Sequence, residues 1–206
     1  MMIIENGKEI LNILRDAVEE QADFLGELDG RSGDGDLGLS MKAAFTAMIQ
    51  VADDYAGESL SEMLMKAALA CNKAAPSTMG TLISAGVMGL AKLTKGLSTL
   101  DDAVLVQMPR AFADAIAKRG KAQRGDKTIL DALYPMAEAV EESFANGRSV
   151  KEAFRAGAEA AEEAANATAG MKAKIGRASW LGDRAAENPD AGAMLCAVLA
   201  QALAIR

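Results

Sequence analysis

Asp29, Asp34 and Asp36 lie within eight residues of one another in the glycine-rich segment GELDGRSGDGDLGLSM. Carboxylates this close together repel one another unless a cation neutralises them, and the glycines allow the backbone to fold tightly enough for all three to converge. Ligands that offer only hard oxygen atoms favour Mg²⁺, Mn²⁺ or Ca²⁺. The segment is therefore a candidate site for a divalent cation.

Two other interpretations of this segment must be weighed. Most Asp-Gly runs are solvated acidic turns that bind nothing. An EF-hand calcium loop would need a bidentate glutamate at its twelfth position, and counting from the three aspartates ends instead on Ser40, Phe45 and Ala47. The residues thus exclude the EF-hand and leave the metal site and the acidic turn as alternatives.

The segment KAAPSTMGTLISAG places the small residues Ser77, Thr78 and Gly80 at the start of a predicted helix. The first turn of a helix offers free backbone amides and a partial positive charge to an anion, and glycine allows close approach. A capped helix start that binds nothing is the simpler alternative, because the segment has neither the lysine nor the spacing of a Walker A loop. On its own the segment is only a weak candidate for an anion site.

Two basic segments follow later in the chain. In RGKAQRGDKTILDAL, Gly120, Gly125 and Asp126 precede a predicted helix, and an N-cap at Asp126 with solvated lysines is the simplest interpretation. The segment MKAKIGRASWLGDRAAENPDAGAM carries four cationic side chains and ends in a Pro-Asp-Ala-Gly turn. Loops this long inside a compact domain are usually functional or disordered. Both segments are therefore candidates for binding.

The scaffold that positions these segments is predicted to be helical throughout. Half of the 206 residues are hydrophobic, only 4% are aromatic, and 4 prolines interrupt the chain. This composition favours helix almost everywhere. Apolar residues recur at helical spacing in eight stretches, approximately 5–26, 38–54, 59–74, 80–95, 100–119, 127–145, 150–168 and 190–205. The pairs Ser59 with Glu62 and Ser149 with Glu152 fit the capping-box pattern and mark two helix starts.

No linker divides the chain, so we predict one all-α domain over residues 1–206. The segments 26–38, 120–127 and 170–192 lack helical periodicity and concentrate glycine. Binding groups commonly lie on loops that a rigid scaffold supports. We therefore expect the functional residues in these three segments.

Charge and composition exclude several classes of function. The net charge of −7 and the lack of a clustered basic face argue against a nucleic-acid groove. The absence of histidine excludes a Ser-His-Asp triad and a histidine-ligated zinc site made by this chain alone. No apolar run reaches the roughly 20 residues of a membrane span, and the start MMIIENGKEI is not a secretory signal. We expect a cytoplasmic protein that binds neither nucleic acid nor membrane.

Taken together and in this order, the segments LDGRSGDGDLG, GKAQRGDKTILDAL, KIGRASWLGDR and PDAG resemble the L subunit of dihydroxyacetone kinases, the DhaL type, and the equivalent C-terminal domain of the single-chain enzymes. The resemblance runs over essentially the whole chain. It implies a barrel of eight helices with the nucleotide and magnesium site at one end. This number of helices agrees with the number that the periodicity indicates.

The resemblance also implies a set of site residues. Asp29, Asp34 and Asp36 would hold two Mg²⁺ ions that bridge the phosphates of ADP or ATP. Two divalent ions would offset the charge of three carboxylates and a phosphate chain, and would position the terminal phosphoryl group. The residues that the resemblance places around the nucleotide are Leu37, Gly38, Leu39, Ser40, Thr78, Met79, Gly120, Ile129, Arg177, Asp190, Ala191 and Gly192.

One position departs from the family pattern. Members commonly read GDGDHG or GDADHG, and the residue that follows the third aspartate here is Leu37 instead of histidine. Leucine cannot donate a hydrogen bond to phosphate or ribose, so any such contact is lost or replaced. The metal ligands are intact. The departure therefore indicates a divergent branch, with another ketose or triose-like substrate, and not a loss of nucleotide binding.

The resemblance implies a partner as well. In this family a histidine of a separate K subunit or K domain holds the ketone substrate, and this chain has no histidine. The predicted function is phosphoryl transfer from a bound nucleotide to a small hydroxyketone on that K subunit, and no catalytic residue is identified beyond the metal site. The alternatives are an ADP-retaining phosphocarrier or regulatory adaptor that a phosphohistidine protein rephosphorylates, and a helical scaffold with an incidental acidic loop.

Overall fold

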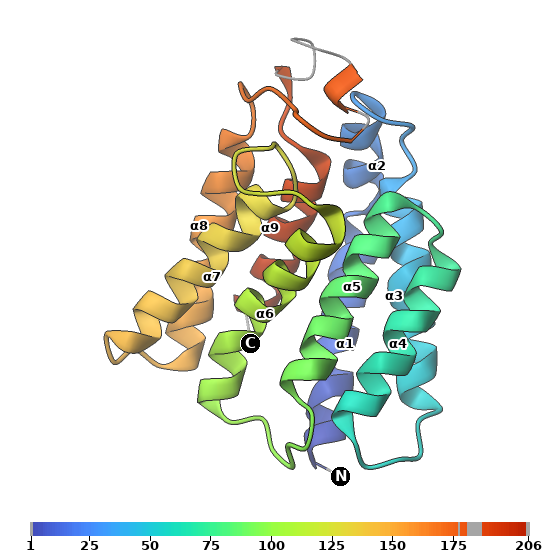
Figure 1. Ribbon diagram of the computed structural model, residues 1–206, viewed down its shortest axis with the longest axis vertical. Coiled ribbons are helices and arrows are strands. Elements are labelled where there is room, and N and C mark those ends of the chain that lie inside the picture. Colours follow the sequence, from blue (N-terminus) through green and yellow to red (C-terminus); the bar gives the residue numbers. More distant parts are fainter. Residues whose placement is uncertain (1, 177, 181–186, 205–206) are drawn as a thin grey trace.

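Nine α-helices contain most of the residues that the computed structural model describes, namely 2–176, 178–180 and 187–204 (Figure 1). The helices are α1 (Met2–Glu20), α2 (Ala22–Gly30), α3 (Leu37–Asp53), α4 (Leu60–Ala74), α5 (Thr78–Leu93), α6 (Asp102–Gly120), α7 (Leu130–Ala145), α8 (Val150–Ala167) and α9 (Ala191–Ala204). The described residues include no strand, so the predicted all-α class is confirmed.

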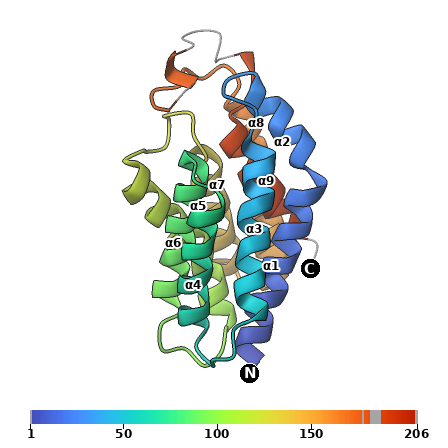
Figure 2. The same cartoon turned by 90° about the vertical axis from the view of Figure 1, so that its right-hand side faces the viewer.

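Eight of these helices close into a barrel. Each helix from α3 to α8 packs against the next one in the chain, α9 packs against α1, and α1 packs against α3. The helices run alternately up and down, as Figures 1 and 2 show. The enclosed core consists largely of alanine, leucine, isoleucine and methionine side chains. The predicted barrel of eight helices is therefore confirmed, with α2 as an additional helix against α3 and α9.

Helix α2 arises where the sequence predicts a single helix over 5–26. The chain turns at Gln21, whose φ of −102° and ψ of 9° interrupt the helix. Neither glycine nor proline stands at the turn. A Cβ atom on Gly38 would lie 1.9 Å from the carbonyl oxygen of Ala22, so the start of α2 packs directly on the first turn of α3. The break between α1 and α2 therefore coincides with a tertiary contact, and no helix-breaking residue in the local sequence indicates it.

Both predicted helix starts are confirmed, and one has the complete capping box. Ser149 accepts a hydrogen bond from the Glu152 amide, and the Glu152 carboxylate accepts one from the Ser149 amide. Ser59 likewise accepts a hydrogen bond from the Glu62 amide, but the Glu62 carboxylate accepts its hydrogen bond from the Tyr55 hydroxyl.

The alternating directions bring four helix starts to one end of the barrel. The first turns of α3, α5, α7 and α9 lie there with the last turns of α2, α4, α6 and α8 (Figure 1). Each helix start presents free amides and a partial positive charge. This end of the barrel is therefore suited to an anionic ligand. None of the helices within the described ranges is long and apolar enough to cross a membrane.

Candidate functional site

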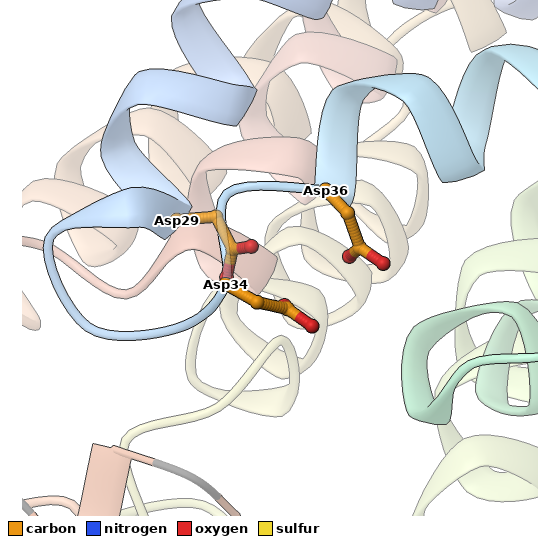
Figure 3. A group of neighbouring side chains, drawn as sticks. All are labelled: Asp29, Asp34 and Asp36. Carbon is orange, nitrogen blue, oxygen red and sulfur yellow. The ribbon is translucent and has the colours of Figure 1, made fainter.

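The three aspartates converge at this end of the barrel. Asp29 lies in the last turn of α2, Asp34 in the connecting loop, and Asp36 immediately before α3 (Figure 3). One carboxylate oxygen from each lies within 4.8 Å of the others; Asp29 is partly buried, and Asp34 and Asp36 are exposed. Together the three carboxylates could hold a divalent cation.

Backbone hydrogen bonds hold the loop in this shape. The amides of Ser32 and Gly33 donate to the carbonyl oxygen of Asp29, and the amide of Gly35 donates to its Oδ2 at 2.9 Å. Gly35 has a φ of +78°, which side chains rarely tolerate. A Cβ atom on Gly33 would lie 2.5 Å from Oδ1 of Asp29. These two glycines therefore allow the loop to fold around the Asp29 carboxylate.

A pocket of about 310 Å³ adjoins the three carboxylates. The first residues of four helices line it: Leu37 of α3, Thr78 of α5, Leu130 of α7 and Ala191 of α9. Ser77 accepts a hydrogen bond from the amide of Gly80 and so caps α5. The site therefore combines an acidic cluster that could hold a cation with several helix N-termini, and this combination suits a phosphorylated ligand.

Eight of the twelve residues expected around a nucleotide line this pocket. They are Leu37, Thr78, Met79, Gly120, Ile129, Asp190, Ala191 and Gly192. A Cβ atom on Gly192 would lie 2.6 Å from Cε of Met79 and 3.4 Å from Cβ of Ile129, so segments far apart in the sequence meet here. Leu37, which replaces the family histidine, is only 5% exposed and packs in the core at the edge of the pocket.

The other four expected residues do not line the pocket within the described ranges. Gly38 packs against the backbone of Ala22, and Leu39 is 73% exposed. Ser40 lies in the first turn of α3, where its amide donates to the carbonyl oxygen of Asp36. Arg177 lies outside the described residues.

Lys127 and Thr128 also line the pocket, although the sequence suggested only solvated lysines here. Lys127 is 3% exposed and has a φ of +60°. Its Nζ donates a hydrogen bond to the carbonyl oxygen of Asn188 at 2.8 Å. Burial lowers the pKa of Lys127, and the nearby Asp190 carboxylate opposes that effect. The sequence signal for this residue is the run GDKT between two predicted helices, and burial is not evident from it.

The loop that carries Lys127 is held by two other carboxylates. Asp131 accepts hydrogen bonds from the amides of Gly125 and Thr128 at 2.5 and 2.7 Å. Asp126 accepts one from the amide of Gln123 and lies 3.5 Å from Nζ of Lys174. Helix α7 begins at Leu130, so the N-cap expected at Asp126 is wrong. Asp126 instead fixes the loop and connects it to the segment that contains Lys174.

Asp190 is a partly buried carboxylate at the start of α9. Its Oδ1 accepts a hydrogen bond from the amide of Ala193, and its own amide donates to Oγ1 of Thr168. Burial raises the pKa of Asp190 to about 6, while the Ala193 amide and the Lys127 ammonium limit the rise. The charge of Asp190 is therefore costly to keep in the folded protein.

This raised pKa predicts a pH-dependent effect of Asp190→Asn. Between about pH 4 and pH 6 the folded state binds more protons at Asp190 than the unfolded state, so the contribution of Asp190 to stability falls as pH rises through this range. Asparagine keeps an acceptor for the Ala193 amide without the charge. We expect Asp190→Asn to raise the Tm of the nucleotide-free protein more at about pH 8 than at about pH 4. A Tm difference that is constant with pH would contradict the raised pKa of Asp190.

Comparison with known proteins gives the family of the chain. Residues 31–205 match the DAK2 domain. The ADP-binding subunit DhaL of the PEP-dependent dihydroxyacetone kinase of Escherichia coli is 32% identical over 190 residues, which cover 92% of this chain and 90% of that subunit. A D-erythrulose kinase of Mycolicibacterium smegmatis is 37% identical over 193 residues, which cover 93% of this chain but only 33% of that enzyme.

The fold also matches a solved structure. The dihydroxyacetone kinase of C. freundii, in complex with AMP-PNP and Mg²⁺, superposes with a TM-score of 0.72 at 21% sequence identity. The match covers 96% of this chain and 33% of that one, so the chain spans about one third of the larger enzymes and most of the separate E. coli subunit. The chain belongs to the DAK2 domain family, together with the DhaL subunits of dihydroxyacetone kinases.

Proposed function

We propose that this protein is the nucleotide-binding subunit of a dihydroxyacetone-type kinase, a phosphotransferase that acts on a hydroxyl group of a small ketose. The observation that carries the proposal is the convergence of Asp29, Asp34 and Asp36 at the edge of a pocket lined by four helix starts. The relatives support it, because the E. coli subunit is named for ADP binding and the M. smegmatis enzyme for erythrulose phosphorylation.

The donor set fits magnesium. The cluster offers carboxylate oxygens only, which are the ligands that Mg²⁺ prefers, and two of the three carboxylates are exposed. When bound, two Mg²⁺ ions would neutralise the aspartates and the nucleotide phosphates and would stabilise charge during phosphoryl transfer. The role of Asp29, Asp34 and Asp36 is to hold these ions at the start of α3.

The rest of the pocket suits the remainder of an adenine nucleotide. Apolar side chains from Met79, Leu82, Ile116 and Ile129 line it and could contact the base. The helix starts and the metal cluster would then face the phosphates, because their partial and full positive charges favour anions. In this arrangement the nucleotide would be bound and oriented by Met79, Gly120, Ile129 and Gly192.

Four further contacts are proposed on the family resemblance alone. They are Gly38, Leu39, Ser40 and Arg177.

We propose that the ketone acceptor is held by a K subunit. The sequence contains no histidine, whereas the family pattern assigns a histidine of a K subunit to the ketone substrate. The general base would belong to the partner. The contribution of this subunit would therefore be to position the phosphoryl group and to stabilise its charge. A separate K subunit is the proposed partner.

Reconstitution tests this function. We expect this chain, mixed with a K subunit, to phosphorylate dihydroxyacetone or erythrulose from ATP, and we expect the rate to fall to background in EDTA or without either chain. The measurement is a coupled assay of ketose phosphate, with each ketose compared at equal concentration. A chain that binds Mg²⁺-nucleotide but gives no turnover from ATP would contradict direct transfer from ATP.

The name of the E. coli relative favours a second candidate, since that kinase is described as PEP-dependent and its subunit as ADP-binding. In this alternative, ADP stays bound as a coenzyme and a phosphohistidine protein rephosphorylates it. Nucleotide that persists through purification, with turnover from the phosphohistidine donor and none from free ATP, would favour this alternative. Rapid exchange of nucleotide with turnover from ATP would favour the kinase that uses ATP directly.

A further inference from the structure

Three segments of the site are joined through one residue, Asn188. The side-chain oxygen of Asn188 accepts a hydrogen bond from Nη1 of Arg31 at 2.9 Å. Its carbonyl oxygen accepts another from Nζ of Lys127 at 2.8 Å. Arg31 directly follows α2 and lies two residues beyond Asp29, and Lys127 lies in the loop before α7. Asn188 therefore connects the loop of the three aspartates to the loop before α7, which also lines the pocket.

We propose that Arg31, Lys127 and Asn188 form a clasp that fixes residues 187–190 against the pocket and slows the release of bound nucleotide. The inference rests on the proposed nucleotide function of the pocket. Asp190, two residues beyond Asn188, lines the pocket and caps α9 through the Ala193 amide. A displacement of Asn188 would therefore be transmitted to the pocket wall.

The conformation of Lys127 supports a functional role for this connection. A lysine with a φ of +60° costs conformational energy that glycine or asparagine would largely avoid. Burial of its ammonium group adds a further cost. The structure offsets both costs by directing Nζ to the Asn188 carbonyl oxygen and by placing the Asp190 carboxylate nearby. Strain of this kind persists where the surrounding structure requires one particular geometry.

The three members of the clasp differ in a way that permits a clean test. Lys127 lines the pocket, so its replacement could act by direct contact with the nucleotide. Arg31 and Asn188 are absent from the pocket lining, and Arg31 is exposed. An effect of Arg31→Ala or Asn188→Ala on nucleotide release would therefore be transmitted through residues 187–190. Both side chains belong to one hydrogen bond, so the double variant should resemble each single variant.

The experiment measures the dissociation of mant-ADP from the full chain with Mg²⁺, by stopped flow against excess ADP. We expect Arg31→Ala and Asn188→Ala each to raise the dissociation rate roughly three- to tenfold, as the loss of one exposed hydrogen bond allows. The double variant should release mant-ADP no faster than the single variants. Binding of Mn²⁺ to the nucleotide-free protein should be unchanged, because the three aspartates remain.

Two further variants complete the test, a matched control at Asn146 and a replacement of Lys127. Asn146→Ala changes an exposed asparagine at the end of α7, at the opposite end of the barrel, and should leave the rate unchanged. Lys127→Met should raise the rate at least as much as Asn188→Ala. Unchanged rates in Arg31→Ala and Asn188→Ala, or additive effects in the double variant, would overturn the clasp while leaving nucleotide binding intact. A wild-type chain that fails to bind mant-ADP would overturn the proposed function and the clasp together.

Discussion

Asp36→Asn should lower the affinity for Mg²⁺-ADP by about 100-fold or more, because loss of a group that merely supports a metal ligand already costs about 10- to 100-fold. Asp36 stands immediately before α3, and its carboxylate makes no capping hydrogen bond to that helix. Removal of its charge also relieves repulsion from Asp29 and Asp34 in the metal-free loop. The Tm of the nucleotide-free variant should therefore be equal to the wild-type value or higher.

Isothermal titration of the purified variant measures the affinity, and thermal unfolding measures the stability. Asp53→Asn makes the same change at the opposite end of the same helix, where the side chain is exposed. This control should bind Mg²⁺-ADP as the wild type does. An Asp36→Asn protein that loses folding and binding together would mean that the carboxylate acts in the fold and not as a metal ligand.

Gly38→Ala should give the largest loss of stability among the site substitutions. The added Cβ would lie 1.9 Å from the carbonyl oxygen of Ala22 and 2.7 Å from its carbonyl carbon. These are backbone atoms, so no side-chain rotation can relieve the overlap, and α2 and α3 must separate. Overpacking of this kind costs about 2–3 kcal/mol of unfolding free energy.

Urea unfolding of the nucleotide-free variant measures this loss, with Gly26→Ala as the comparison. A Cβ on Gly26, also in α2, would lie 3.3 Å from the carbonyl oxygen of Gly35, and alanine gains helix propensity there. We expect that variant to stay within about 1 kcal/mol of the wild type. Wild-type stability in Gly38→Ala with weakened nucleotide binding would instead show that Gly38 contacts the nucleotide.

Helical periodicity sufficed for the scaffold because burial in an all-α protein repeats along each helix. The starts of α4 and α8 were predicted from Ser59 and Ser149, and serine caps at these helix starts are seen in the structure. The division of the first predicted helix at Gln21 was missed, since the packing of Gly38 on Ala22 involves residues of another helix. The closure of the barrel by α9 against α1 is a contact between the two ends of the chain, and it entered only through the family resemblance.

The acidic cluster could be anticipated for a local reason. Its three aspartates lie close together in the sequence, and the glycines that shape their loop lie among them. Lys127 shows the opposite case, since a lysine in a polar loop indicates a solvated side chain. Its burial depends on Asn188 and Asp190, which are about sixty residues away and pack beside it only in the folded barrel. The local pattern therefore predicted the convergence of the three aspartates and missed the burial of Lys127.

Calorimetric titration tests the nucleotide-linked magnesium site most directly. The wild-type chain is titrated with ADP and with ATP, each in Mg²⁺ and in EDTA, after removal of any nucleotide carried through purification. We expect binding in Mg²⁺, loss of that binding in EDTA, and the same loss in Asp36→Asn. A chain that carries no nucleotide and binds none in Mg²⁺, or one that binds equally well in EDTA, would contradict the assignment of Asp29, Asp34 and Asp36 as a nucleotide-linked magnesium site.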